Sequence, residues 1–246
     1  IEANTDIKVN RKFGIGGGTT NIQPAMLSGD LDIYVEYTGT AWLNVLSKDL
    51  PDNNQINLEE LNEIYQKQFN LKWLGLLGFN NTYGLAISNE NAQKKNITNY
   101  SQLALQSENF TFGAEFDFFE RSDAFPGLKK VYPFSFKKLE EMDINLRYQA
   151  FEQGKINAVD VFTTDAQIKK LDLKVLQDDK NYFPSYEAGI VIRQEILEKY
   201  PELEPLLNKL QKKISTEQMQ QLNYEVEIEK KTPAEVAKNF LNILQN

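Results

Sequence analysis

The spacing of apolar residues along the chain predicts a mixed succession of helices and strands. Residues 58–69 carry apolar side chains at helical spacing, and Tyr65 belongs to that stripe, so we expect it in the core rather than in a binding site. Further helices are expected at residues 20–28, 100–105 and 146–153, and over most of the chain after Arg193. Short apolar runs predict strands at residues 33–37, 73–77, 110–116, 156–162 and 173–176.

Two stretches of the chain repeat one plan, residues 25–41 (AMLSGDLDIYVEYTGTA) and residues 150–166 (AFEQGKINAVDVFTTDA). In each, a helix end meets a glycine, Gly29 or Gly154, and an apolar strand follows. Eight residues after the glycine comes an aromatic residue, Tyr37 or Phe162, and then a hydroxyl-rich turn. The repeat predicts two similar lobes, each presenting a ring at the carboxyl end of a strand, where open α/β sheets bind ligands. A chance likeness between two strand-to-turn junctions is the alternative.

A second repeat pairs residues 82–87 (TYGLAI) with residues 185–192 (SYEAGIVI). Each places a hydroxyl and a tyrosine before a strand of small and branched residues, which suggests two hinge strands between the lobes. We therefore expect residues 1–86 to form the first part of lobe 1, residues 87–188 to form lobe 2, and residues 189–246 to return to lobe 1 as a helical tail. Residues 1–12 read as the end of a helix entering a strand, so the opening strand and helix of lobe 1 are expected to be missing.

Composition narrows the possible functions. The 246 residues are 41% hydrophobic and 25% charged, as in folded domains, and the net charge of −8 argues against nucleic acid as a partner. No apolar run is long enough to span a membrane, and no signal peptide is visible. The chain has neither cysteine nor histidine, which excludes thiolate chemistry and Ser-His-Asp triads and removes the commonest zinc ligands. Catalysis by Asp, Glu, Lys or Tyr stays open as an alternative, but no cofactor or metal is expected.

Four aromatic residues occupy equivalent places in the two repeats, namely Tyr37, Phe162, Tyr83 and Tyr186. Rings lining one cleft between the lobes would attract a cation, and a quaternary ammonium suits such a box because it has no hydrogen to donate. The alternative for each ring, taken alone, is an ordinary core position.

Arg121 is the candidate partner for an anion, since its forked guanidinium can hold a carboxylate. An ion pair with a nearby acidic residue is the alternative. Thr40 could add a hydroxyl, and Asn81 and Glu115 are weaker candidates. The acidic cluster around Arg121 matches no calcium loop, so we expect its members to cap helices or face solvent, with a turn at Pro126-Gly127. The cluster consists of Glu115, Asp117, Glu120 and Asp123, with Ser122 as a further cap.

The chain resembles the substrate-binding proteins of osmoprotectant ABC importers, the glycine betaine, carnitine and choline binding family. The matching segments are GDLDIYVEYTGT, LGFNNTYGLAI, FGAEFDFFERSDAFPGL, LRYQAFEQGKINAVDVFTTDA and DDKNYFPSYEAGIVIR. The resemblance implies a type II periplasmic-binding-protein fold, in which two α/β lobes close on a ligand. It places an aromatic box on Tyr37, Tyr83, Phe162 and Tyr186, carboxylate contacts on Arg121 and Thr40, and a further contact on Asn81. The family commonly has tyrosine where this chain has Phe162, and its opening segment, which also contacts ligand, is absent here.

The resemblance further implies a monomeric receptor that delivers a quaternary ammonium compound, such as glycine betaine, carnitine or choline, to an ABC permease. The expected location is the extracytoplasmic face of the membrane or the periplasm, with the chain lipid-anchored or fused to the permease. Related domains similar to ergothioneine importers make a trimethylated betaine of that type the alternative ligand. An enzyme or a ligand-sensing domain on the same two-lobed fold is the alternative of another class.

Overall fold

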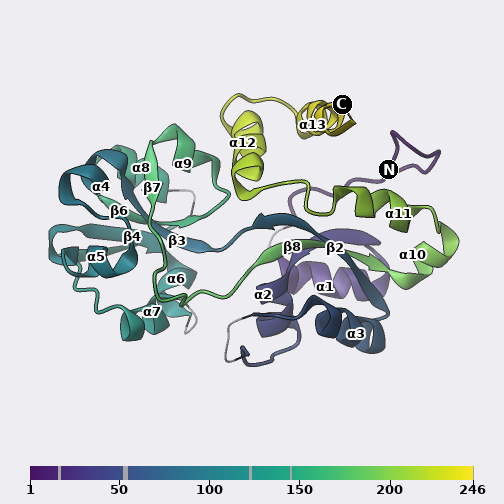
Figure 1. Ribbon diagram of the computed structural model, residues 1–246, viewed down its shortest axis with the longest axis horizontal. Helices are drawn as coiled ribbons and strands as arrows, with labels where there is room; N and C mark the ends of the chain where they lie inside the picture. The colour runs from purple at the N-terminus through teal and green to yellow at the C-terminus, as the bar shows by residue number, and fades with distance from the viewer. Residues whose placement is uncertain (16–17, 52–54, 122–123, 145, 246) are drawn as a thin grey trace. The chain divides into compact units, whose positions relative to one another are not determined.

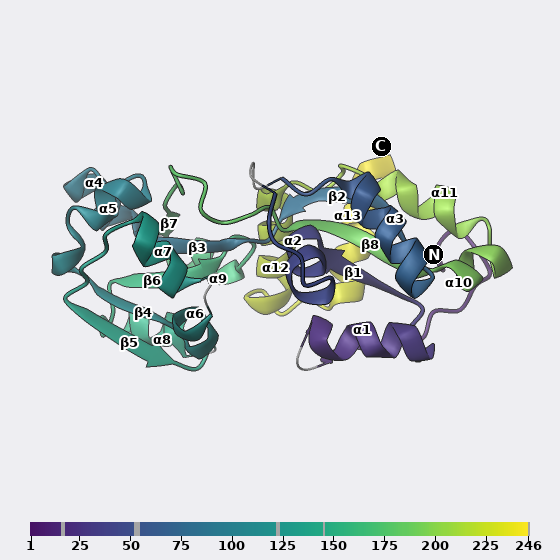
Figure 2. The same cartoon turned by 90° about the horizontal axis from the view of Figure 1, so that it is seen from below.

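The computed structural model describes residues 1–15, 18–51, 55–121, 124–144 and 146–245, and the chain divides into two compact units. Unit 1 comprises Ile1–Asn81 and Pro184–Thr216, and unit 2 comprises Thr82–Phe183 and Glu217–Asn246. Each unit holds one sheet together with helices (Figures 1 and 2), so the predicted mixed α/β class is confirmed.

Unit 1 is built on an antiparallel sheet in which β8 lies between β1 and β2. Val191 of the central strand is opposite Tyr34 on one side and Trp73 on the other. The elements of this unit are α1 (Thr19–Ser28), β1 (Ile33–Tyr37), α2 (Thr38–Thr40), the π-helix η1 (Ala41–Val45), α3 (Leu58–Phe69), β2 (Leu71–Asn80), β8 (Glu187–Arg193), α10 (Gln194–Lys199), α11 (Leu203–Leu207) and the 3₁₀-helix η3 (Asn208–Leu210).

The core of unit 1 forms where α3 packs on β2. Asn57 starts this helix, because its side-chain oxygen accepts hydrogen bonds from the backbone N–H groups of Glu59 and Glu60 at 2.8 and 3.1 Å. Tyr65 is fully buried, and its ring meets that of Trp73 edge-on at 5.6 Å. The prediction that Tyr65 is a core residue is confirmed.

Unit 2 is built on a mixed sheet with the strand order β5-β4-β6-β3-β7. Strand β4 is parallel to β5 and β6, whereas β3 is antiparallel to β6 and β7. The elements are β3 (Tyr83–Ser88), α4 (Asn89–Lys95), α5 (Tyr100–Ala104), the 3₁₀-helix η2 (Ser107–Asn109), β4 (Thr111–Glu115), α6 (Phe116–Glu120), α7 (Phe125–Val131), β5 (Lys138–Met142), α8 (Arg147–Glu152), β6 (Ala158–Phe162), α9 (Ala166–Lys170), β7 (Leu173–Val175), α12 (Thr216–Glu227) and α13 (Pro233–Gln245).

The helical tail after Arg193 is divided between the two units. Residues Glu217–Asn246 group with unit 2, so the chain passes between the units three times rather than twice. Two contacts account for this placement of α12. The side-chain amide of Asn223 donates to the carbonyl oxygen of Thr164 at 2.9 Å, and the Lys169 ammonium lies 4.8 Å from the centre of the Tyr224 ring. The lobe boundaries proposed at residues 86 and 188 stay a prediction.

The first sequence repeat is confirmed as a structural one. Gly29 follows α1 with φ of 82°, and Gly154 follows α8 with φ of 69°. This left-handed conformation is one that glycine adopts without a steric penalty, which explains why both helices end there. The strands that follow, β1 and β6, end on Tyr37 and Phe162 as predicted.

Several local predictions are wrong. Between residues 88 and 109 only the helix at 100–105 was predicted, but the structure has a further helix, α4. Ser88 caps it by accepting a hydrogen bond from the N–H of Asn91 at 3.2 Å. Pro126 and Gly127 lie at the start of helix α7 and do not form the predicted β-turn. Proline is tolerated there because the first N–H groups of a helix have no hydrogen-bond partner within the helix. Residues 1–12 form a turn, a bend and chain without regular secondary structure instead of a helix end and a strand. Ser122 and Asp123 lie outside the described residues. Across the part of the chain that is described, no helix combines the length and apolarity that a membrane span requires.

Candidate ligand-binding site

Unit 1 holds four of the seven predicted site residues, Tyr37, Thr40, Asn81 and Tyr186. Tyr37 is half-buried at the end of β1, where a side-chain hydrogen bond links it to Asn81 and its ring meets Phe79 edge-on at 6.5 Å. Burial raises the pKa of the Tyr37 phenol, so this ring is neutral at physiological pH.

Tyr186 is held to the same region through its backbone. Its N–H donates to the side-chain oxygen of Asn80 at 2.7 Å, and its carbonyl oxygen accepts from the N–H of Asn81 at 3.1 Å. The structure therefore brings Tyr37, Asn81 and Tyr186 together within unit 1. Tyr186 is only 6% exposed, and its ring lies so close to Gly39 that a Cβ added there would come within 2.7 Å of two ring carbons.

Thr40 lies in α2 and is half-buried, but the hydroxyl that anchors this turn belongs to Thr38. The Thr38 hydroxyl donates to the carbonyl oxygen of Ser185 at 3.0 Å and accepts from the N–H of Glu187 at 3.1 Å. Sequence reasoning missed this role. The proposed contact between Thr40 and a carboxylate stays a prediction.

A buried acid that sequence reasoning also missed, Glu36, directly precedes Tyr37. Its carboxylate is 1% exposed and accepts hydrogen bonds from the Thr19 hydroxyl at 2.8 Å, the Tyr34 hydroxyl at 3.0 Å and the Tyr37 N–H at 2.7 Å. Burial raises the pKa of Glu36, and these three donors oppose the rise.

Unit 2 holds the other three predicted residues, Tyr83, Phe162 and Arg121. Tyr83 and Phe162 are opposite each other in the pairing of β3 with β6, and their ring centres are 5.0 Å apart. The central carbon of the Arg121 guanidinium lies 6.0 Å from the centre of the Tyr83 ring. The three side chains therefore form one group, with aromatic surface and a guanidinium side by side.

Three of the acidic residues near Arg121, namely Glu115, Asp117 and Glu120, lie within the described part of the chain. Asp117 and Glu120 are exposed, and Glu115 is half-buried with a pKa that burial raises. Among the described residues, no group of three or more acidic side chains could hold a metal ion. Asp117 lies in the first turn of α6 rather than at its N-cap. Its negative charge stabilises the helix there, because the N-terminal end of a helix carries a partial positive charge.

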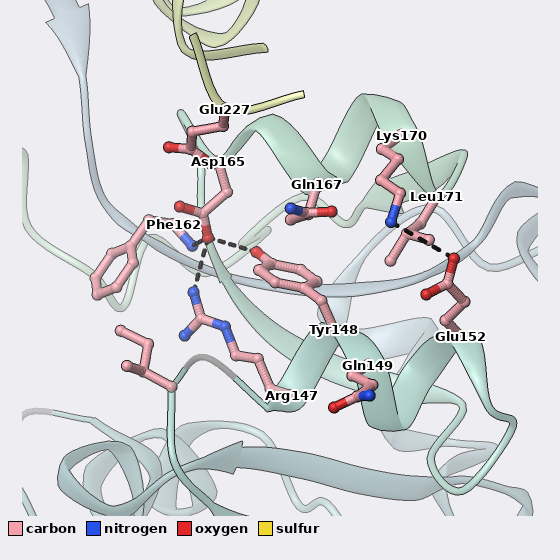
Figure 3. Close-up of a pocket in the computed structure, with 11 residues that line it drawn as sticks. Arg147, Tyr148, Gln149, Glu152, Phe162, Asp165, Gln167, Lys170, Leu171 and Glu227 are labelled. Carbon is pink, nitrogen blue, oxygen red and sulfur yellow. Dashed lines mark hydrogen bonds and ion pairs between the residues drawn. The ribbon is translucent and has the colours of Figure 1, made fainter. Parts of the chain in front are cut away.

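Beside Phe162, a pocket of about 370 Å³ opens in unit 2 (Figure 3). Arg147 lines this pocket, and its guanidinium donates to Asp160 at 2.8 Å and to Asp165 at 2.7 Å. Tyr148 donates its hydroxyl to the same oxygen of Asp165. Burial raises the pKa of Asp160 to about 7, although the Arg147 guanidinium pulls it down.

This ionic cluster was not predicted, although one signal for it stands in the sequence. Asp160 is a charged residue in the middle of an otherwise apolar strand. A buried carboxylate requires a cation or several donors, so a partner such as Arg147 should have been sought nearby.

Comparison with known proteins gives consistent matches. A family described as the substrate binding domain of ABC-type glycine betaine transport systems matches residues 1–242. A Helicobacter pylori (strain G27) protein, named ergothioneine transport permease/ergothioneine binding protein EgtU, is 63% identical over 238 residues. The match covers 97% of this chain but only 43% of that protein. The carnitine transport binding protein OpuCC of Listeria monocytogenes is 35% identical over 243 residues, which are 98% of this chain and 79% of OpuCC.

Solved structures agree with these relatives. A crystal structure of a glycine betaine/carnitine/choline ABC transporter superposes with a TM-score of 0.83 at 35% identity, covering 92% of this chain and 84% of the other. Apo YehZ from Escherichia coli superposes with a TM-score of 0.71 at 26% identity, covering 92% of this chain and 85% of the other.

Proposed function

Because this chain belongs to the family of substrate-binding domains of ABC-type glycine betaine transport systems, as its motifs predicted, we propose that it captures ergothioneine for import. The fold is the type II periplasmic-binding-protein fold of that family. The observation that carries the choice of ligand is the 63% identity to a protein named for ergothioneine, against 35% to one named for carnitine. Both compounds carry a trimethylammonium group and a carboxylate.

The grouping of side chains within each unit supports a betaine ligand. Tyr83 and Phe162 present neighbouring rings in unit 2, and Tyr37 and Tyr186 are held together in unit 1. Each ring that contacts a quaternary ammonium adds about 0.5–2 kcal/mol. We propose that all four rings contact one bound cation.

The position of Arg121 favours an α-betaine. In glycine betaine and ergothioneine, the carboxylate and the quaternary nitrogen are attached to the same carbon, so one ligand needs its anion and cation partners side by side. Arg121 lies 6.0 Å from the centre of the Tyr83 ring, a separation suited to that requirement. Thr40 and Asn81 are proposed to add polar contacts to the same ligand.

Calorimetric titration tests the ring assignment and the ligand together. Ergothioneine, glycine betaine, carnitine and choline are titrated into the purified chain, with histidine as the unmethylated control, and ergothioneine should bind most tightly. Tyr83→Ala and Tyr186→Ala should each weaken binding about tenfold or more, as expected for one lost cation–π wall. Tyr200→Ala, which removes a half-buried tyrosine outside the proposed site, is the matched control. Unchanged affinity in both site variants would exclude the aromatic cage.

The same titration tests Arg121. If its guanidinium binds the ligand carboxylate, Arg121→Ala should weaken ergothioneine and glycine betaine much more than choline, which has no carboxylate. An equal loss for all three ligands would contradict the assignment.

The partner is proposed to be an ABC permease on the extracytoplasmic side, where the binding domains of such importers work. The Helicobacter relative is named as permease and binding protein together, and this chain spans 43% of its length. We also propose that the chain is monomeric and that it releases its ligand chemically unchanged. Light scattering should give one chain per particle, and mass spectrometry should recover intact ligand after incubation. Deletion of residues 1–242 from the gene should abolish uptake of labelled ligand by cells.

A further inference from the structure

Phe162 is supported by one guanidinium. The central carbon of the Arg147 guanidinium lies 5.3 Å from the centre of the Phe162 ring and 5.0 Å from that of Tyr148. Both distances are within the range of cation–π contact. In Figure 3 the guanidinium lies below the carboxylate of Asp165, to which it is hydrogen-bonded, with the Phe162 ring to its left.

The same guanidinium also fixes the backbone that carries Phe162. The carboxylate of Asp165 accepts from the Phe162 N–H at 2.9 Å, and the Asp165 N–H donates to the Phe162 carbonyl oxygen, also at 2.9 Å. This pair closes the turn that follows β6. Arg147 ties the turn to α8 through its 2.7 Å bond to Asp165.

Burial leaves Arg147 little freedom. Its side chain is 2% exposed, and that of Asp160 is fully buried, so their 2.8 Å ion pair is shielded from water. A buried guanidinium with two fixed carboxylate partners has one available orientation. The Phe162 ring, which packs against this guanidinium, is therefore restricted in its orientation as well.

We propose that Arg147 is a positioning residue for the ligand site, which holds the Phe162 ring in its binding orientation before ligand arrives. The proposal rests on the proposed function, in which Phe162 is one wall of the cage. A ring that is already ordered in the empty protein has no side-chain entropy to lose on binding, so it contributes more affinity than a mobile ring. Arg147 itself need not touch the ligand.

The test is a double-mutant cycle measured by calorimetry with ergothioneine and glycine betaine. Arg147→Lys keeps a positive charge beside Asp160, but it loses the planar guanidinium that packs on the Phe162 ring and the ion pair with Asp165. Because the ring is then less well ordered, binding should weaken about three- to tenfold. In a Phe162→Ala background the same change should weaken binding less than about twofold, because the ring through which Arg147 acts is gone. The matched control is Arg193→Lys in unit 1, where Arg193 bridges Asp32 and Glu195 on the surface and no change in affinity is expected.

A spectroscopic measurement separates positioning from general stability. With 4-fluorophenylalanine at position 162, the ¹⁹F resonance of the ligand-free chain should move toward the random-coil position in Arg147→Lys and stay in place in Arg193→Lys. If Arg147→Lys does not fold, Arg147→Lys with Asp160→Asn replaces it, since that pair leaves no uncompensated buried charge.

Each outcome has a separate meaning. An unchanged resonance, or an equal loss of affinity with and without the Phe162 ring, would overturn the positioning role. If Phe162→Ala alone leaves affinity unchanged, the cage assignment of the proposed function is wrong instead.

Discussion

Gly39 is a position where one added carbon should damage the packing of unit 1. A Cβ placed on Gly39 would lie 2.7 Å from two carbons of the Tyr186 ring and 2.9 Å from the carbonyl oxygen of Ser185. Distances below 3.0 Å do not occur between such atoms, so something must move. The ring is buried, and the carbonyl accepts the 3.0 Å hydrogen bond from Thr38, so neither group can move without loss.

The size of the effect follows from overpacking. Forcing an extra carbon into a packed core costs about 1–3 kcal/mol. Two of the three contacts are to a ring and one is to backbone, so we expect Gly39→Ala to lower the free energy of unfolding of unit 1 by about 2–3 kcal/mol. Since Tyr186 is also a proposed wall of the cage, the displaced ring should weaken ligand binding as well.

The two tryptophans of the chain, Trp42 and Trp73, both lie in the core of unit 1. Urea unfolding followed by tryptophan fluorescence therefore reports on the unit that contains Gly39. The matched control is Gly75→Ala, because the three atoms nearest to its new Cβ all belong to the exposed side chain of Gln211, which can rotate away. Its cost should therefore stay below about 1 kcal/mol. If the two variants unfold at the same urea concentration as the parent chain, the packing of Tyr186 on Gly39 is not as described.

Two further predictions concern polar groups in the same unit. Thr38→Val removes the hydroxyl that joins Ser185 to Glu187, so it should lower the free energy of unfolding by about 1–3 kcal/mol in the same fluorescence assay. Thr40→Val should instead weaken betaine binding with little change in stability. A reversed pattern would exchange the roles of the two threonines. Burial raises the pKa of Glu36, so the native state keeps this proton at pH values where the unfolded chain has lost it. Glu36 therefore contributes its full stabilisation at pH values below the ordinary pKa of a glutamate side chain. This stabilisation is lost as the pH rises through the raised pKa that Glu36 has in the native state. Glu36→Gln should flatten that part of the stability curve, and an unchanged curve would show that Glu36 does not titrate there.

Much of the fold could be predicted because its signals are local. The bounds of β1 and α3 follow from apolar spacing and match the structure residue for residue. Helix α4 was missed because its segment is polar and has no apolar stripe, and its stability comes from the Ser88 cap and from packing on β3 and β7. The placement of α12 with unit 2 depends on contacts between Asn223 and Thr164 and between Tyr224 and Lys169. These pairs are 59 and 55 residues apart in the chain, so the contacts leave no periodic signal.

The candidate site divides in the same way. Tyr37, Tyr83 and Phe162 could be proposed from the sequence because they repeat at fixed places relative to glycines and strands. Thr38, Glu36 and Arg147 were missed because their importance depends on which atoms they meet across the unit. Sequence patterns identify the rings, whereas the groups that hold those rings become visible only with the tertiary structure.

The two repeats support their aromatic residues by different means. Strand β1 buries Glu36 directly before Tyr37 and satisfies it with hydroxyl and N–H donors, whereas β6 buries Asp160 and pairs it with Arg147. A lone guanidinium behind Phe162 would oppose the proposed cationic ligand, since like charges repel more strongly in a partly buried site than in bulk water. Arg147 has two carboxylate partners, Asp160 and Asp165, so the cluster as a whole is not positive. If Phe162 is a wall of the proposed cage, the second carboxylate lets the Arg147 guanidinium support the ring without repelling a bound quaternary ammonium.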